Sequence, residues 1–257
     1  MTDLSPLGAL VRRHDPDRFL TALFAPAEKR EALFLLYAFN HELARAREVA
    51  SEPTLALIRL HWWREVVEGT RRRHEVAGPL GAALDAGVFD PEDLMAIIDG
   101  REAETTPSVP TVADFRAYVL ATAGGLAAAA GRLLGADTAT RERLRALGGA
   151  YGLSGVLRSR FVLAQQQRCL LPEDFLGGQG LALDTVRHYP DAVDVSGLVA
   201  IGQMMLADGR GRFSRDVIAA ALPAVLARRD LPRPPPVAPR GLGDRLAVLA
   251  AYTLSRV

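Results

Sequence analysis

The first candidate for chemistry in the sequence is the segment 37–48, YAFNHELARARE. Carboxylates four residues apart on a helix project from one face, where together they can bind a divalent cation such as Mg²⁺. In this segment Glu48 supplies one carboxylate, but the residue four positions before it is Ala44. The spacing is that of a metal-binding helix from which one of the two acids is missing.

Other sequence signatures of catalysis are absent from the chain. Glycine-rich phosphate loops, a GxSxG nucleophile elbow and an HExxH zinc motif do not occur. The five histidines are scattered, and no two stand at ligand spacing on one helix (His14, His41, His61, His74 and His188). The single cysteine, Cys169, excludes an intrachain disulfide and a cysteine metal cluster, and we expect it to be a small buried side chain.

Composition narrows the class of protein. The 257 residues are 49% hydrophobic, enough for the core of one large domain, and the formal net charge of +1 gives no electrostatic basis for binding nucleic acid. The longest uncharged apolar run, 117–131, is shorter than the ~20 residues that a membrane-spanning helix needs. No secretory signal is seen. We therefore expect a cytoplasmic protein, or one peripheral to the cytoplasmic face of the inner membrane.

Hydrophobic residues recur at steps of three and four along most of the chain, which is typical of amphipathic helices. Asp90 before Pro91 and Thr111 with Asp114 have the spacing of helix N-caps. The pattern predicts helices over 26–50, 54–74, 90–100, 111–135, 138–167, 196–207, 212–227 and 243–257. It predicts an all-α, single-domain helical bundle, with a domain over 1–231, a proline-rich linker over 232–239 and a C-terminal helix over 240–257 packed on that domain.

Glycines crowd two of the predicted helices. Gly124, Gly125 and Gly131 lie in one, and Gly148, Gly149, Gly152 and Gly155 lie in the next. Each glycine inside a helix costs about 1 kcal/mol relative to alanine, so their number needs a compensating reason. Close contact between the helices is one reason, and room for a ligand between them is the other.

Five blocks occur in a defined order between Phe19 and Leu181. They read FLTALFAPAEKREALFLLYAFNHELARARE, HWWREVVEG, IIDGREAET, TVADFRAYVLATAGGLAAAAGRLLG and YGLSGVLRSRFVLAQQQRCLLPEDF. In this order they resemble the squalene/phytoene synthase superfamily, all-helical enzymes that join two prenyl diphosphates head to head. The resemblance implies a helical bundle of the isoprenoid synthase type.

The resemblance also implies a metal site that this sequence does not complete. Members of the family hold Mg²⁺ between two DxxxD motifs on facing helices, and the metal neutralises the diphosphate that leaves. Matched without gaps, the four aspartate positions fall on Ala44, Glu48, Ser159 and Leu163. Three of these four residues are not acidic, and no Asp lies in 37–84 or 138–173 to replace them.

From this match we expect a degenerate cavity with no catalytic residue and no metal ligand. Its expected lining is Tyr37, Asn40, His41, Ala44, Glu48, Ser159 and Leu163. Four arginines are candidate contacts for an anion in place of metal: Arg45, Arg158, Arg160 and Arg168. Arginine forks can hold phosphate directly.

The run YAFNHELARAREVASEPTLALIRLHWWREVVE resembles one branch of the superfamily more closely. That branch is non-catalytic and serves as a mitochondrial respiratory complex I assembly factor. The similarity implies a protein partner, either a complex I subunit or an assembly intermediate, and no cofactor. The arginine-rich, proline-rich chain without a mitochondrial targeting sequence indicates a bacterial relative.

Two alternatives stay open beside this pseudoenzyme interpretation. The first is a metal-independent protein that binds an isoprenoid lipid or lipid diphosphate in the cavity. The second is an active prenyl transferase with a rebuilt, Mg²⁺-dependent site. The alternatives differ in whether prenyl diphosphates bind, and in whether binding needs a divalent metal.

Overall fold

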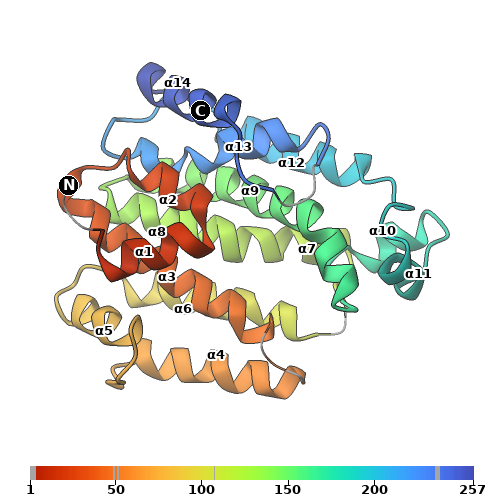
Figure 1. The fold of residues 1–257 in the computed structure, drawn as a ribbon, viewed down its shortest axis with the longest axis horizontal. Coiled ribbons are helices and arrows are strands. Elements are labelled where there is room, and N and C mark those ends of the chain that lie inside the picture. The colour runs from red at the N-terminus through yellow and green to blue at the C-terminus, as the bar shows by residue number, and fades with distance from the viewer. Residues whose placement is uncertain (1–3, 49, 51, 107, 235–237) are drawn as a thin grey trace.

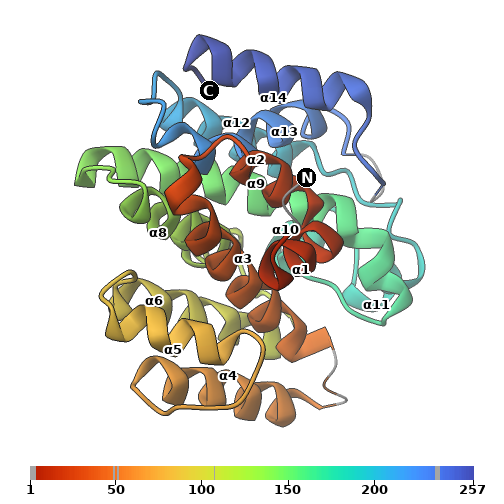
Figure 2. The ribbon, with the colours of Figure 1, turned by 60° about the vertical axis from the view of Figure 1, so that its left-hand side comes forward.

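The helices form successive layers in the computed structural model, which describes residues 4–48, 50, 52–106, 108–234 and 238–257 (Figures 1 and 2). Within these residues the β-type pairings are two isolated bridges, so the all-α prediction is confirmed. The helices are α1 (Pro6–His14), α2 (Pro16–Ala22), α3 (Ala27–Glu48), α4 (Pro53–Val67), α5 (Ala77–Asp85), α6 (Pro91–Arg101), α7 (Val112–Val119), α8 (Gly125–Leu133), α9 (Thr138–Gln165), α10 (Glu173–Gly177), α11 (Leu183–His188), α12 (Ser196–Gly209), α13 (Pro223–Asp230) and α14 (Leu242–Leu254).

The longest helix, α9, lies at the centre of the bundle. It packs against α8, α12 and α13, while α4 and α14 lie at opposite ends of the molecule (Figure 1). Its 28 residues would extend about 42 Å at the usual rise of 1.5 Å per residue, so α9 can contact several layers at once. A side chain on α9 can therefore face both the N-terminal helices and the C-terminal ones.

The predicted N-caps are present. The Asp90 carboxylate accepts a hydrogen bond from the Glu92 backbone N–H, and Thr111 and Asp114 form a reciprocal capping box. Such side chains satisfy backbone N–H groups that have no partner inside the helix. These local signals fix where α6 and α7 begin.

Three predicted helices differ in the structure. The one predicted over 212–227 is a single 3₁₀ turn, η3 (Ile218–Ala220), followed by α13, because Pro223 lacks an N–H and fits only a first helical turn. The one predicted over 54–74 ends at Val67, since Gly69 adopts a φ of 114° that stops the helix. The one predicted over 111–135 contains a π-helical turn, η2 (Leu120–Gly124).

The C-terminal segment returns to the body of the protein. The predicted linker, 232–239, includes residues 235–237, which lie outside the described residues. Beyond it, α14 packs against α13, and Arg229 of α13 donates a hydrogen bond to Asp244 of α14 at 2.7 Å. The charged residue at the start of this segment, Arg240, reaches back into the interior of the bundle.

The glycines of α9 serve both of the purposes left open by the sequence. A Cβ on Gly148 would collide with the Ala123 carbonyl oxygen and would lie 2.6 Å from the Ala127 Cβ, so this glycine allows close helix contact. Gly155 has no atom within 4 Å of such a Cβ, and it lines a cavity. The same helix thus packs tightly at Gly148 and leaves space two turns later, at Gly155.

Substituting Gly148 and Gly155 separately tests this division. We expect Gly155→Ala to stabilise the protein by up to about 1 kcal/mol, because alanine is the better helix former and meets no neighbour. We expect Gly148→Ala to destabilise the protein. Overpacking costs about 1–3 kcal/mol, which outweighs the gain of up to about 1 kcal/mol in helix propensity. The measurement is the free energy of unfolding in urea. A Gly148→Ala protein as stable as the wild type would contradict the packing assigned here.

Candidate functional site

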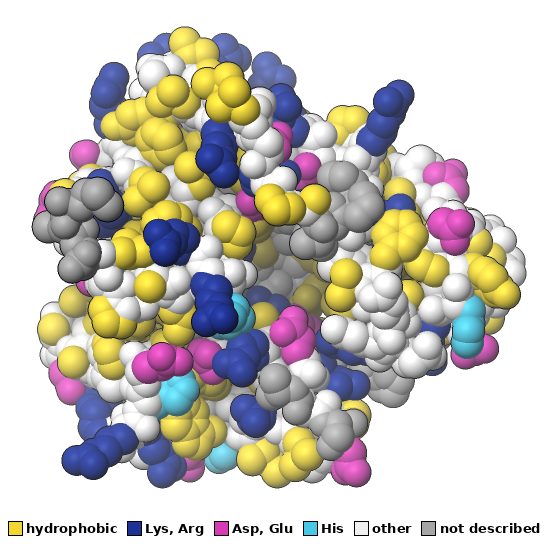
Figure 3. Space-filling view, in the orientation of Figure 1, with side chains coloured by type: hydrophobic (Ala, Val, Ile, Leu, Met, Phe, Trp, Pro, Cys, Tyr) yellow, Lys and Arg dark blue, Asp and Glu magenta, His cyan; other side chains and the backbone are white. Residues whose placement is uncertain are grey.

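A cavity of about 280 Å³ lies beside α9, at its C-terminal half. Four of the residues matched to metal positions line it: Ala44 and Glu48 from α3, and Ser159 and Leu163 from α9. The two pairs come from different helices and share one cavity. The face of the molecule seen in Figure 3 is hollowed near its middle.

The carboxylates around this cavity do not form a metal cage. Glu104 accepts a hydrogen bond from the Tyr118 hydroxyl at 2.7 Å and pairs with Arg101, while Asp230 is paired with arginines. Glu48 stands at the rim of the cavity, where partial desolvation of its carboxyl raises its pKa. The described residues contain no group of three or more His, Cys, Asp or Glu side chains placed to hold a metal ion. This donor set does not fit a Mg²⁺ cluster.

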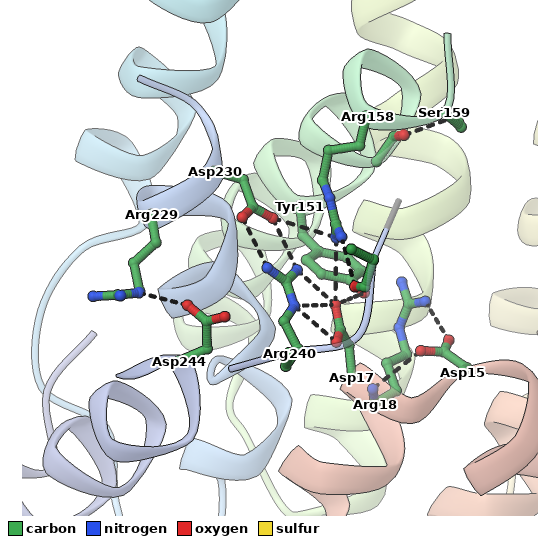
Figure 4. Close-up of polar contacts among 12 residues, drawn as sticks. Asp15, Asp17, Arg18, Tyr151, Arg158, Ser159, Arg229, Asp230, Arg240 and Asp244 are labelled. Carbon is green, nitrogen blue, oxygen red and sulfur yellow. Dashed lines mark hydrogen bonds and ion pairs between the residues drawn. The ribbon is translucent and has the colours of Figure 1, made fainter. Parts of the chain in front are cut away.

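The strongest electrostatic feature is a buried ion network at the cavity wall (Figure 4). Arg240 lies between Asp17 of α2 and Asp230 of α13, with Nη2–Oδ2 and Nη1–Oδ1 distances of 2.7 and 2.8 Å. Arg158 of α9 approaches the same two carboxylates, at 3.8 Å from Asp17 and 3.4 Å from Asp230. The Tyr151 hydroxyl donates to Asp17 at 3.1 Å. We call these five residues the Asp17–Asp230 network.

Charge is balanced inside this network, with two carboxylates against two guanidinium groups. Burial alone would lower the pKa of Arg240, but its hydrogen bonds and attraction to the two aspartates outweigh burial and raise it. Arg158, which we expected to contact an anion, is therefore already neutralised by acids. Its Nε is buried and has no hydrogen-bond partner among the described residues.

The other candidate arginines divide into one at the cavity and two away from it. Arg168 lines the cavity and forms no ion pair within the described part of the chain; burial lowers its pKa. Arg45 bonds Glu42 at 3.2 Å, and Arg160 lies 4.3 Å from the centre of the Phe161 ring. Of the residues described, the cavity lining includes neither Arg45 nor Arg160, which corrects their expected role there.

Three residues of α3 that we expected in the cavity are placed elsewhere. Tyr37 is buried beside Arg18, Asn40 accepts a hydrogen bond from Arg101 at 2.8 Å, and the His41 ring stacks on His14 at 4.3 Å. Residues 41 and 48 of one helix are separated by about 10 Å along its axis. At that distance His41 lies against α1 and not in the cavity, while Asn40 reaches the cavity only through its hydrogen bond with Arg101.

Several lining residues were not anticipated. Arg101, Glu104 and Tyr118 form one hydrogen-bonded group from α6, η1 (Glu102–Thr105) and α7. Their only signals in the sequence are the blocks IIDGREAET, with Arg101 and Glu104, and TVADFRAYVLATAGGLAAAAGRLLG, with Tyr118, which carry the family resemblance without assigning a role to each residue. Nothing in the sequence identified Asp230 as a cavity residue, because its partners Arg158 and Arg240 lie on other elements of the fold.

The squalene/phytoene synthase family model matches residues 11–235. The chain belongs to the squalene/phytoene synthase family. The match covers α2, α3, α9 and α13, so the cavity and four of the five residues of the Asp17–Asp230 network fall within the family region. The resemblance inferred from the ordered blocks is confirmed.

Relatives of this family chain include two mammalian proteins named NADH dehydrogenase (ubiquinone) complex I, assembly factor 6. The human protein is 29% identical over 189 residues, covering 71% of this chain and 57% of that protein. The bovine protein is 28% identical over 226 residues, covering 84% of this chain and 68% of that protein. The chain thus spans somewhat more than half of the human relative's length.

Two solved structures share the fold of this family chain. A dehydrosqualene synthase in complex with ligand has a TM-score of 0.77 at 14% identity, covering 96% of this chain and 94% of that one. The squalene synthase HpnC from Alicyclobacillus acidocaldarius has a TM-score of 0.64 at 18% identity, covering 97% and 92%. The prediction of an isoprenoid synthase-type helical bundle is confirmed.

The Asp17–Asp230 network predicts a large effect of removing its central cation. Arg240→Met leaves two buried carboxylates with Arg158 alone, and breaking a buried pair in this way costs about 3–5 kcal/mol. Arg233→Met is the matched control, since Arg233 is exposed and forms no ion pair among the described residues. Chemical unfolding measures the free energy of unfolding of both variants. Equal stability of the two variants would contradict a structural role for the network.

Proposed function

We propose that this chain is an assembly factor for respiratory complex I that retains the prenyl synthase fold without catalysing prenyl transfer. The observation that carries the proposal is the combination of its relatives and its cavity. Proteins named complex I assembly factor 6 match 71–84% of the chain, and the cavity presents Ala44 and Leu163 at positions where the family has metal-binding acids.

Electrostatics supports the absence of prenyl transfer. Alanine and leucine side chains offer no oxygen to a hard cation, and Ser159 donates its hydroxyl hydrogen to the Gly155 carbonyl at 2.9 Å. Four arginines line the same cavity (Arg18, Arg101, Arg158 and Arg168). Arg101 and Arg158 pair with Glu104 and Asp230, so these two cavity carboxylates are already neutralised, and Arg168 adds a positive charge that has no ion pair among the described residues.

In the proposed role the protein binds a complex I subunit or an assembly intermediate through its surface. It needs no cofactor for this, and it works in the cytoplasm or at the cytoplasmic face of the inner membrane. The structure has no helix among its described residues that is long and apolar enough to cross a membrane.

Deletion of the gene in a host that makes complex I tests the proposal. We expect membranes of the deletion strain to lose NADH:quinone oxidoreductase activity while succinate:quinone oxidoreductase activity stays unchanged. Plasmid-borne wild-type protein restores the activity. The Glu48→Gln variant restores it equally, because no metal-binding carboxylate is required.

Unchanged complex I activity after deletion would refute the assembly role. Failure of Glu48→Gln alone to complement, with normal protein levels, would point to carboxylate chemistry in the cavity instead. The Arg233→Met variant, changed at an exposed residue outside the cavity, is the control and should restore the activity.

A second candidate, metal-independent binding of an isoprenoid diphosphate, has its own supporting observation. Arg168 is unpaired in the described part of the chain, and the buried Ser154 Oγ and Arg101 Nε at the cavity have no hydrogen-bond partner there. Leu163 and Val162 supply apolar surface beside them. Buried donors without partners are costly, and a phosphate oxygen would satisfy them.

Calorimetry in EDTA with a non-hydrolysable farnesyl diphosphate analogue tests this second candidate. Because hydrogen bonds to charged groups contribute about 1.5–3 kcal/mol, Arg168→Gln is expected to weaken binding by roughly tenfold or more. Arg160→Gln, on α9 and outside the cavity lining, is the control. No binding by the wild-type protein in EDTA would eliminate this candidate.

A further inference from the structure

The outer face of α14 is the most exposed apolar surface of the molecule's C-terminal end. Leu242, Leu246 and Leu249 have 72%, 54% and 45% of their surface exposed. Their spacing of four and three residues places them on one face of the helix. The opposite face carries Val248 and Ala251, which are buried against the bundle. The leucine stripe therefore does not serve the packing of α14.

A groove of about 750 Å³ lies beside this stripe, between α12, α13 and α14. Leu254, which is 67% exposed, belongs to the groove wall and extends the apolar surface from the leucine stripe into the groove. Four arginines also line the groove: Arg210, Arg228, Arg229 and Arg256. Among the described residues that line it, none has an acidic side chain.

The positive charge in the groove is largely uncompensated. Arg229 pairs with Asp244, but Arg210, Arg228 and Arg256 are exposed and form no ion pair in the described part of the chain. The pKa of Arg228 is lowered, first by partial burial and then by the positive charges of Arg210 and Arg256. Three like charges held close together favour an anionic partner.

We propose that this face, formed by Leu242, Leu246, Leu249 and Leu254 with Arg210, Arg228 and Arg256, binds the surface of an anionic phospholipid bilayer. The leucines would enter the boundary between headgroups and acyl chains, and the arginines would bind lipid phosphates. The proposal concerns a surface at the end of the molecule, separate from the cavity, and does not depend on the assembly role.

The shape of this face favours a bilayer over a folded protein partner. α14 is the outermost helix at its end of the molecule in both ribbon views (Figures 1 and 2). Hydrophobic side chains gather there with Lys or Arg side chains around them (Figure 3). A protruding apolar helix bordered by arginines has the arrangement of an interfacial amphipathic helix, which lies on a membrane without crossing it.

Co-sedimentation of the full chain with vesicles tests the proposal. We expect binding to vesicles of phosphatidylcholine with phosphatidylglycerol, weak binding to phosphatidylcholine alone, and a loss of binding as salt is raised. Arg228→Gln with Arg256→Gln should weaken binding to the anionic vesicles by about twenty-fivefold, since each basic residue near the surface contributes about fivefold. Leu246→Glu should weaken it by roughly tenfold or more.

Two controls come from α4 at the opposite end of the molecule. Leu57→Glu and Arg59→Gln change exposed residues outside the proposed face, and both variants should bind vesicles as the wild type does. All variants alter exposed side chains, so their thermal unfolding should match that of the wild type.

Three results would overturn the proposal. One is equal binding to neutral and anionic vesicles, and another is no binding to either. The third is a self-association, seen by light scattering without lipid, that Leu246→Glu abolishes; the face would then bind a second copy of the chain.

Discussion

Buried charge is the constraint on which the arrangement of this molecule depends. Asp17 and Asp230 come from α2 and α13, and both are nearly inaccessible to solvent. Arg240 satisfies them from a position 223 residues after Asp17, and Arg158 completes the balance from α9. An unpaired carboxylate at this depth would cost several kcal/mol, so these elements must stay together. One network thereby joins the two ends of the chain to the central helix.

This network links the cavity to the C-terminal face. Arg158 and Asp230 line the cavity, and Arg240 stands just before α14. Asp244 of α14 in turn pairs with Arg229 of α13, the helix that carries Asp230. The position of α14 on the bundle is thus set partly by the same charges that close the cavity wall. Because the other three cavity arginines, Arg18, Arg101 and Arg158, are paired with acids, Arg168 is left as the unpaired cavity arginine among the described residues.

Much of the fold could be predicted from local signals. Three- and four-residue hydrophobic spacing gave most of the long helices, and the caps at Asp90 and Thr111 gave two of their starts. The break at Pro223 follows from a local rule that the predicted helix over 212–227 did not respect. The π-helical turn η2 has no such rule, because it depends on packing against α9.

The candidate site was partly predictable for a related reason. Ala44, Glu48, Ser159 and Leu163 were placed by ordered blocks of sequence, and the structure brings them to one cavity. His41 lies too far along α3 and is covered by His14 of α1. Ion pairs such as Asp17–Arg240 could not be found, since any of the chain's arginines could neutralise a given aspartate until the helices are packed.

Our central proposal is that the cavity of this family member does not perform metal-dependent prenyl transfer. It is tested most directly by incubating the purified chain with farnesyl diphosphate and Mg²⁺ and measuring inorganic diphosphate released over time. We expect no release above that of buffer with Mg²⁺, and no change when EDTA is added. Sustained release that requires Mg²⁺ and disappears in Glu48→Gln would contradict it and make the chain an active transferase.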